Sequence, residues 1–191
     1  MIRRKQFLQN IISESDRLNR LIDKVLDLEK FETGKQKINV SENRIMETIE
    51  NAIEPLQQLL TNKQISIHVE GKENIKALFD EDRIFQVVTN LVSNAIKFCP
   101  EQDGLIVIAV HDKAEFIEVQ VRDNGKGITK GDFENIFDKF YQSTNQNFKK
   151  PIGSGLGLAI CKQIIETHKG KIWATNGANG GACLNFTLPK K

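Results

Sequence analysis

DNGKGI at residues 123–128 decides the fold of this chain of 191 residues, together with the later run GSGLGLAI at residues 153–160. Asp123 stands at the start of the first glycine turn, and the second turn leads into a predicted helix. Glycine lets the main chain adopt positive φ angles and approach a ligand closely. Two such turns, about thirty residues apart, therefore indicate a nucleotide held by backbone amides, with the segment between them covering the ligand.

A third stretch, NLVSNAIKF at residues 90–98, points to the same kind of site. Asn90, Asn94 and Lys97 are spaced four and three residues apart, so they share one face of a helix. An amide oxygen can bind Mg²⁺, and an ammonium group can bind phosphate oxygens. Taken alone, this pattern also fits a helix whose polar face is merely solvated. The other side of the helix carries apolar residues: Leu91, Val92, Ala95 and Ile96.

In their order along the chain, NLVSNAIKF, DNGKGI, IFDKFYQ and GSGLGLAI resemble the N, G1, F and G2 boxes of sensor histidine kinases. These boxes belong to ATP-binding domains of the GHKL superfamily. The resemblance covers about residues 80–189. Strands and helices are interleaved without regular βαβ repetition, which favours a two-layer α/β sandwich. The resemblance implies the same fold: a mixed, largely antiparallel sheet covered by three helices.

A long amphipathic helix is predicted from Arg3 to about Phe31, followed by Gly34 as its stop. Its segment SDRLNRLIDKVLDLEKFETGK resembles the second helix of the family's dimerisation and phosphotransfer hairpin. We therefore expect residues 1–34 to be a partial hairpin helix and residues 35–191 to be the catalytic ATP-binding domain. Packing on its own domain and pairing in a homodimer through residues 3–31 both remain open. The apolar stripe consists of Leu8, Ile11, Leu18, Ile22 and Val25, widened by Leu21 and Leu28.

Between these motifs the apolar periodicity predicts further elements. Ser41 is expected to cap a helix whose core-facing residues are Ile45, Ile49, Ile53, Leu56 and Leu60, with a bend at Pro55. Asp80 is expected to cap the asparagine helix. A short helix is predicted over residues 131–140, and another runs from the second glycine turn to about His168. Strands are predicted at residues 37–40, 64–69, 75–79, 105–111, 116–121, 171–175 and 183–188.

The resemblance assigns roles to the site residues. Asp123 can accept a hydrogen bond from the exocyclic amine of adenine, which guanine lacks at the corresponding edge. Asn94 matches the Mg²⁺-coordinating asparagine, and Asn90 and Lys97 match its phosphate-side neighbours. The remaining residues expected to bind nucleotide are Gly125, Gly127, Ile128, Tyr141, Gly153, Gly155, Leu156 and Gly157.

The segment between the two glycine turns is expected to form a lid over the nucleotide. Phe137, Phe140 and Tyr141 match the F box, and we interpret Phe137 as a core residue and Tyr141 as lying nearer the ligand. Lys149 and Lys150 could reach phosphates on closure, although exposed lysines usually serve solubility.

No histidine of this chain fits the family's phosphoacceptor motif. His68 and His111 fall in predicted strands, and His168 lies near a helix C-terminus, where an imidazolium complements the helix dipole. We therefore expect a histidine protein kinase domain that binds ATP and Mg²⁺ and transfers the γ-phosphoryl group to a histidine on a helix absent from this sequence. A response regulator receiver domain would then accept the phosphoryl group, and the chain alone would not autophosphorylate.

Two alternatives remain. Another GHKL protein kinase or ATPase is one, but the ATPases use a glutamate in the asparagine helix, and residues 87–94 contain no acid. A nucleotide-binding scaffold or sensing module without kinase activity is the other. The last glycine box departs from the family's Gly-x-Gly, since this chain reads Asn179, Gly180, Gly181, and we leave it out of the predicted site.

Amino-acid composition and charge bear on binding partners and cellular location. The 27 basic and 25 acidic side chains give a net charge of +2, which argues against nucleic acid and against membrane contact by this fragment. No apolar run reaches the length of a membrane span. Cys99, Cys161 and Cys183 lack a CxxC spacing, which favours reduced thiols and a cytoplasmic location; Cys99 is the one to test for a redox role. The parent protein could be anchored in the inner membrane.

Overall fold

The computed structural model describes residues 2–34, 37–142, 154–178 and 180–190. A five-stranded sheet forms one layer of the body, with the strand order β2-β4-β5-β7-β6. Strand β2 is parallel to β4, and the other neighbours are antiparallel. The strands are β2 (Ile65–Glu70), β4 (Gly104–Asp112), β5 (Phe116–Asp123), β6 (Ile172–Asn176) and β7 (Ala182–Pro189).

Alternating burial along the strands explains why the sheet has one covered face. Ile117, Val119 and Val121 of β5 are buried, whereas Glu118 and Gln120 between them are partly exposed. Successive side chains of a strand point to opposite faces, so this alternation matches a half-buried antiparallel sheet. The structure thus confirms the strands predicted from periodicity at this position.

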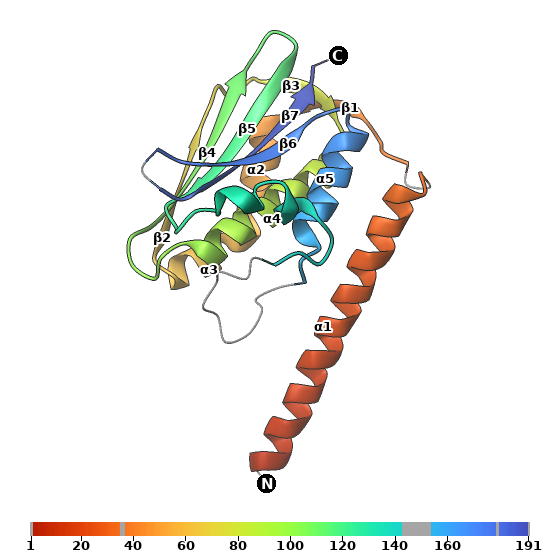
Figure 1. Ribbon diagram of the computed structural model, residues 1–191, viewed down its shortest axis with the longest axis vertical. Coiled ribbons are helices and arrows are strands. Elements are labelled where there is room, and N and C mark those ends of the chain that lie inside the picture. Colours follow the sequence, from red (N-terminus) through yellow and green to blue (C-terminus); the bar gives the residue numbers. More distant parts are fainter. Residues whose placement is uncertain (1, 35–36, 143–153, 179, 191) are drawn as a thin grey trace.

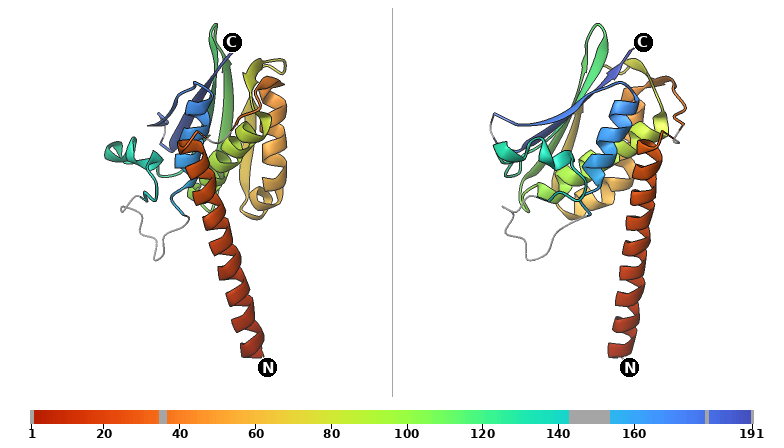
Figure 2. Two further views of the ribbon diagram at one scale, coloured as in Figure 1. Left: turned by 90° about the vertical axis from the view of Figure 1, so that its right-hand side faces the viewer. Right: turned by 45° about the vertical axis from the view of Figure 1, so that its right-hand side comes forward.

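Helices cover the apolar face of the sheet (Figure 2). They are α2 (Ile45–Ile53), the 3₁₀ turn η1 (Glu54–Leu56), α3 (Gln57–Asn62), α4 (Glu81–Phe98) and α5 (Gly157–Thr167). The 3₁₀ turn at Pro55 is the predicted bend, since proline removes a backbone donor inside a helix. The two-layer α/β sandwich is confirmed. The predicted stripe of the second helix is buried at Ile45, Ile49, Ile53 and Leu60 and partly buried at Leu56.

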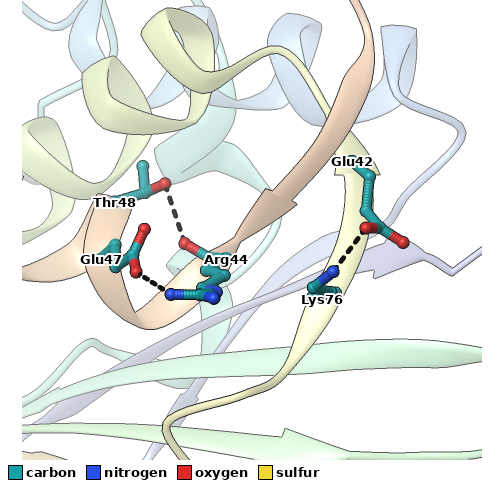
Figure 3. A network of polar contacts seen from close by, with 5 residues as sticks. All are labelled: Glu42, Arg44, Glu47, Thr48 and Lys76. Atoms are coloured by element: carbon teal, nitrogen blue, oxygen red, sulfur yellow. Dashed lines mark hydrogen bonds and ion pairs between the residues drawn. The ribbon is translucent and has the colours of Figure 1, made fainter.

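The first short strand lies four residues later than predicted, and Ser41 is not a helix cap. Strand β1 (Ser41–Arg44) pairs antiparallel with β3 (Lys76–Phe79), and Lys76 forms an ion pair with Glu42 at 2.7 Å (Figure 3). Helix α2 begins at Ile45, whose N–H donates to the Ile75 carbonyl at 3.2 Å. Pairing with a distant strand has replaced the local cap.

Residues 131–140 do not form the predicted short helix. The segment contains two separate 3₁₀ turns, η2 (Lys130–Asp132) and η3 (Asn135–Phe137). Bonds of the i→i+3 type, such as Asp138 N–H to the Asn135 carbonyl at 2.9 Å, tighten the chain. Phe140 then adopts a φ of +61°, which ends any helical run.

Helix α1 (Ile2–Glu32) projects from the body, as Figure 1 shows. Near its C-terminal end, Leu28 and Phe31 are buried, and Arg83 of α4 lies over the Phe31 ring at 5.3 Å. The helix ends at a turn in which Gly34 has a φ of +65°, as predicted. Within the described ranges, no helix is sufficiently long and apolar to cross a bilayer.

Candidate nucleotide-binding site

Helix α4 joins the two glycine turns along one face. Near its middle, Asn90 Oδ1 lies 3.6 Å from the position that a Cβ on Gly157 would take. At its C-terminal end, the Phe98 carbonyl oxygen lies 2.4 Å from the corresponding position on Gly125. Eight residues at 1.5 Å each separate these contacts by about 12 Å. The half-buried Asn94 and Lys97 lie between them in the sequence, so all three predicted polar residues belong to the stretch that joins the turns.

Asp123 ends strand β5 and is buried, with 7% of its surface exposed. Its Oδ1 accepts hydrogen bonds from the Gly125 N–H at 2.8 Å and the Ala182 N–H at 3.2 Å. Burial raises the pKa of Asp123, and the two backbone donors partly oppose that rise. The second carboxylate oxygen receives no hydrogen bond from a described residue. A fixed carboxylate with one free acceptor can bind an exocyclic amine.

The first glycine turn is held by a residue that the sequence reasoning missed. Asn176, the last residue of β6, accepts the Ile128 N–H at 2.8 Å and donates to the Ile128 carbonyl at 2.7 Å. Gly127 has a φ of +76°, and a Cβ there would lie 2.8 Å from Asn176 Oδ1. The turn therefore needs glycine at this position. The dipeptide Asn176-Gly177 is a turn signal in the sequence, but nothing local relates it to Ile128.

The last glycine box, which we left out of the predicted site, lies against Asp123. A Cβ on Gly181 would lie 1.8 Å from the Asp123 carbonyl oxygen, and the next residue, Ala182, donates to the Asp123 carboxylate. Gly181 has a φ of +79°, which is accessible to glycine. The third turn therefore packs directly on the acidic residue, despite its departure from Gly-x-Gly.

The second glycine turn opens helix α5. Gly155 has a φ of +70°, and its carbonyl accepts the Phe140 N–H at 3.0 Å. Leu156 is fully buried in the core, so only its backbone can face a ligand. The N-terminal amides of α5 begin at Gly157, beside Asn90, and form a site that favours anions. Gly153, also predicted to bind nucleotide, lies outside the described residues.

Burial shifts the pKa of Lys97 and Cys99, at the C-terminal end of α4, and of Cys161 in α5. Burial lowers the pKa of Lys97, whose Nζ lies 4.6 Å from the centre of the Phe98 ring. Burial, followed by the nearby charge of Asp123, raises the pKa of the Cys99 thiol. A raised pKa keeps Cys99 protonated and lowers its reactivity as a nucleophile. Burial also raises the pKa of Cys161, whose thiol donates to the Val87 carbonyl at 3.9 Å, to about 12.

Of our two interpretations of the F-box aromatics, the structure confirms the one that places Phe137 in the core. Phe137 is buried in the core, whereas Phe140 is 61% exposed. The Tyr141 hydroxyl donates to Asp132 Oδ1 at 2.7 Å, and this bond raises the pKa of Tyr141. Tyr141 therefore links two parts of the segment between the glycine turns. That Tyr141 approaches a ligand stays a prediction. Lys149 and Lys150 lie outside the described residues.

His168 is not the imidazolium that its helix-end position suggested. It is buried, its Nε2 lies 3.0 Å from the Asp80 N–H, and its Nδ1 lies 2.8 Å from the Ile164 carbonyl. The amide can only donate to Nε2 and the carbonyl can only accept from Nδ1, so the ring is the neutral Nδ1–H tautomer. His68 and His111 lie in strands β2 and β4, as predicted.

Taken together, the turns and α4 offer a carboxylate for a base, backbone amides for phosphates and an ammonium group. Among the residues that the structure describes, no group of three or more His, Cys, Asp or Glu side chains could hold a metal ion. A cation at Asn94 would therefore rely on ligand oxygens for most of its coordination, which suits Mg²⁺ with a triphosphate.

Residues 79–191, more than half of the chain, match the family described as histidine kinase-, DNA gyrase B-, and HSP90-like ATPase. The sensor protein KdpD of Clostridium acetobutylicum is 34% identical over 99% of the chain and 21% of its own length. The sensor histidine kinase WalK of Bacillus subtilis is 35% identical over 97% of the chain and 31% of its own length. The chain thus spans less than a third of these curated relatives.

Solved structures give the same result. The catalytic domain of the histidine kinase ThkA is 32% identical, with a TM-score of 0.71, over 80% of this chain and 99% of that domain. ThkA in complex with the response regulator protein TrrA is 29% identical, with a TM-score of 0.78, over 98% of this chain and 51% of the solved chain. The chain therefore belongs to the histidine kinase-, DNA gyrase B- and HSP90-like ATPase family. Its relatives named above are sensor proteins and histidine kinases.

Proposed function

We propose that this chain is the ATP-binding catalytic part of a two-component sensor histidine kinase. Asp123 is the observation that carries the proposal. A buried carboxylate whose Oδ1 is fixed by two backbone donors presents its other oxygen in a defined direction. Such an acceptor binds the exocyclic amine of adenine and repels the carbonyl that guanine has at that edge.

The remaining site residues divide between the base and the phosphates. Gly125, Gly127 and Ile128 line the base end beside Asp123. Gly155 and Gly157 place the N-terminal amides of α5 at the phosphate end, where the helix dipole favours negative charge. Asn90 contacts that end, which supports a phosphate-side role. Lys97 supplies a positive charge from α4, close to the first turn.

Asn94 would hold Mg²⁺ together with phosphate oxygens, and the ion would neutralise charge on the triphosphate. In the reaction, an imidazole nitrogen would attack the γ-phosphorus, the bond from that phosphorus to the β–γ bridging oxygen would break, and ADP would leave. No histidine of this chain fits the acceptor motif. The acceptor would therefore come from a histidine-bearing dimerisation helix of the parent kinase.

We assign residues 1–34 to the dimerisation and phosphotransfer hairpin and residues 35–191 to the catalytic domain. The solved ThkA catalytic domain covers 80% of this chain, which supports a separable C-terminal part. A homodimer through residues 3–31 would cover the apolar side of α1. A response regulator receiver domain is the proposed partner, by analogy with ThkA, whose solved complex contains TrrA. All three cysteines are free thiols, which supports a cytoplasmic location.

Phosphoryl transfer to a supplied acceptor tests this function. The chain is incubated with γ-labelled ATP and Mg²⁺, alone and with a separately produced histidine hairpin of the parent kinase. We expect no label on the chain alone and label on the hairpin, and none on a hairpin whose acceptor histidine is replaced by glutamine. Binding of ATP without transfer to the intact hairpin would instead identify a nucleotide-sensing module.

A further inference from the structure

The Asn176 side chain makes both of its strong contacts to one backbone residue. Its carbonyl oxygen accepts the Ile128 N–H at 2.8 Å, and its amide nitrogen donates to the Ile128 carbonyl at 2.7 Å. Because a backbone N–H only donates and a carbonyl only accepts, these contacts fix which end of the amide is oxygen. The side chain thus pairs with the first glycine turn as a neighbouring strand would.

The same asparagine is linked to Asp123 through its own sheet. In the β6–β7 ladder Asn176 is the partner of Ala182, and the Ala182 N–H donates to Asp123 Oδ1 at 3.2 Å. The Gly181 carbonyl oxygen and Asn176 Oδ1 lie 3.3 and 2.8 Å from the position of a Cβ on Gly127. The end of β6 and the start of β7 therefore contact both the carboxylate and the turn that follows it.

A purely structural role accounts poorly for this arrangement. Asn176 is exposed, and a hydrogen bond that competes with water adds little to the free energy of unfolding. Position is affected more strongly, because both bonds hold the backbone of Ile128, the residue that directly follows Gly127 at a φ of +76°. A small displacement of the turn changes the direction in which a ligand meets Asp123.

We propose that Asn176 is a positioning residue for the adenine end of the nucleotide site. It fixes the turn at residues 124–128 against the β6–β7 end, so that the Asp123 carboxylate and the backbone of the turn meet one base in one geometry. This inference rests on the proposed function and adds a specificity determinant to the same site. The glycine boxes do not include this residue.

Replacing the amide by a carboxylate tests the role with little change in shape. Asn176→Asp can accept the Ile128 N–H but turns an oxygen toward the Ile128 carbonyl, and Asn176→Ala removes both bonds. Calorimetric titrations with ADP and GDP and thermal unfolding are measured on the full chain. We expect ADP affinity to fall about tenfold in both variants, and the preference for ADP over GDP to narrow.

Asn43→Asp is the matched control. Asn43 Nδ2 donates to the Phe79 carbonyl at 2.8 Å in the small β1–β3 sheet, outside the site residues. We expect this control to lower Tm at least as much as Asn176→Asp and to leave ADP affinity unchanged. If Asn176→Asp and Asn176→Ala both bind ADP with unchanged affinity and selectivity, the positioning role is wrong. If the unsubstituted chain does not bind ADP, the proposed function itself fails.

Discussion

Asp123 illustrates how a residue proposed to bind the nucleotide can oppose stability. Its carboxylate is buried, and that burial raises its pKa, so the ionised form is less favourable in the folded chain than in water. The backbone donors of Gly125 and Ala182 offset only part of this effect. A neutral acceptor of the same shape would keep both hydrogen bonds without the charge.

Asp123→Asn is therefore expected to abolish measurable ADP binding while leaving the free energy of unfolding equal or higher. A raised folded-state pKa means that the folded chain holds a proton over a pH interval in which the unfolded chain has lost it. The penalty of the ionised form is full above that interval, shrinks as the pH falls through the folded pKa, and is gone below the pKa of the unfolded chain. Urea unfolding of both proteins at about pH 8 and about pH 4, near the ordinary carboxyl pKa, should thus show the advantage of the variant shrinking at the lower pH. Undiminished ADP affinity would remove Asp123 from the site.

Alanine substitutions at Gly155 and Gly157 should distinguish a glycine that the fold needs from a glycine that ligand binding needs. A Cβ on Gly157 would meet Asn90 Oδ1 at 3.6 Å, an ordinary contact, and alanine at a helix start is tolerated. A Cβ on Gly155, at a φ of +70°, would lie 2.7 Å from the Phe140 backbone. We expect Gly155→Ala to lower the unfolding free energy by about 1–3 kcal/mol.

Gly157→Ala, in contrast, should retain stability within about 1 kcal/mol and lose at least about tenfold in ATP affinity, because the methyl group enters the space at the α5 amides. Calorimetric titration with ATP and urea unfolding of both variants provide the comparison. Wild-type ATP affinity in Gly157→Ala would show that phosphates do not approach the start of α5.

At the scale of elements, Asp80 and His168 fix three segments at the start of α4. Asp80 Oδ1 accepts the Arg83 N–H at 3.1 Å as the predicted helix cap, and its Oδ2 accepts the Asn39 N–H at 2.7 Å. Its own N–H donates to the neutral His168 ring at the end of α5. The segment after α1, the asparagine helix and the helix of the second glycine turn therefore meet at one residue.

Removing this junction should reduce stability with little effect on nucleotide affinity. Asp80→Ala loses two hydrogen bonds, one of them a helix cap, and is expected to lower the unfolding free energy by about 1–3 kcal/mol. Asp80→Asn retains an oxygen that can cap the helix and should lose less. Urea unfolding and ADP titration of both variants check this. Equal stability of the Ala and Asn variants would contradict the capping role.

The elements that the sequence predicted well are those with an apolar period. Helix α4, with Asp80 as its cap, and strand β5 were found in place because burial repeats along them. Strand β1 was displaced because SENR has no apolar alternation, and its pairing with β3 depends on a segment some thirty residues away. Dependence on distant segments also explains why the site was predicted only in part. Motifs located Asp123, but its contacts with Ala182 and the role of Asn176 depend on how β6 and β7 pair.

At the scale of the molecule, the two ends of α1 differ. Its C-terminal part, from Val25 on, packs against the body and is called the docked end, and the part before it projects from the body and is called the shaft. Leu28 and Phe31 are buried at the docked end, and Val25, Leu28 and Glu29 line a shallow pocket of about 130 Å³ with Phe140 and Leu156. The docked end therefore lies beside both the segment between the glycine turns, at Phe140, and the second glycine turn, at Leu156. The shaft, in contrast, exposes a stripe of apolar side chains to solvent: Leu8, Ile11, Leu18 and Ile22.

An exposed stripe of this length is expected to associate with a second copy. The wild-type chain should shift from monomer to dimer as its concentration rises in sedimentation equilibrium. Since burying a leucine or isoleucine contributes about 1.5–3 kcal/mol, the double variant Leu18→Glu, Ile22→Glu should weaken the dimer at least about a hundredfold. Leu59→Glu places the same charge on another exposed leucine, in α3, and should dimerise like wild type.

The same double variant separates association from nucleotide binding. Because Asp123, α4 and the glycine turns lie in the body, its ADP affinity should equal that of the wild-type chain. A wild-type chain that stays monomeric at the highest concentration would show that the stripe on α1 does not pair with a copy of itself. A matching loss of ADP affinity in the double variant would show that the shaft of α1 acts on the nucleotide site, through the docked contacts at Phe140 and Leu156.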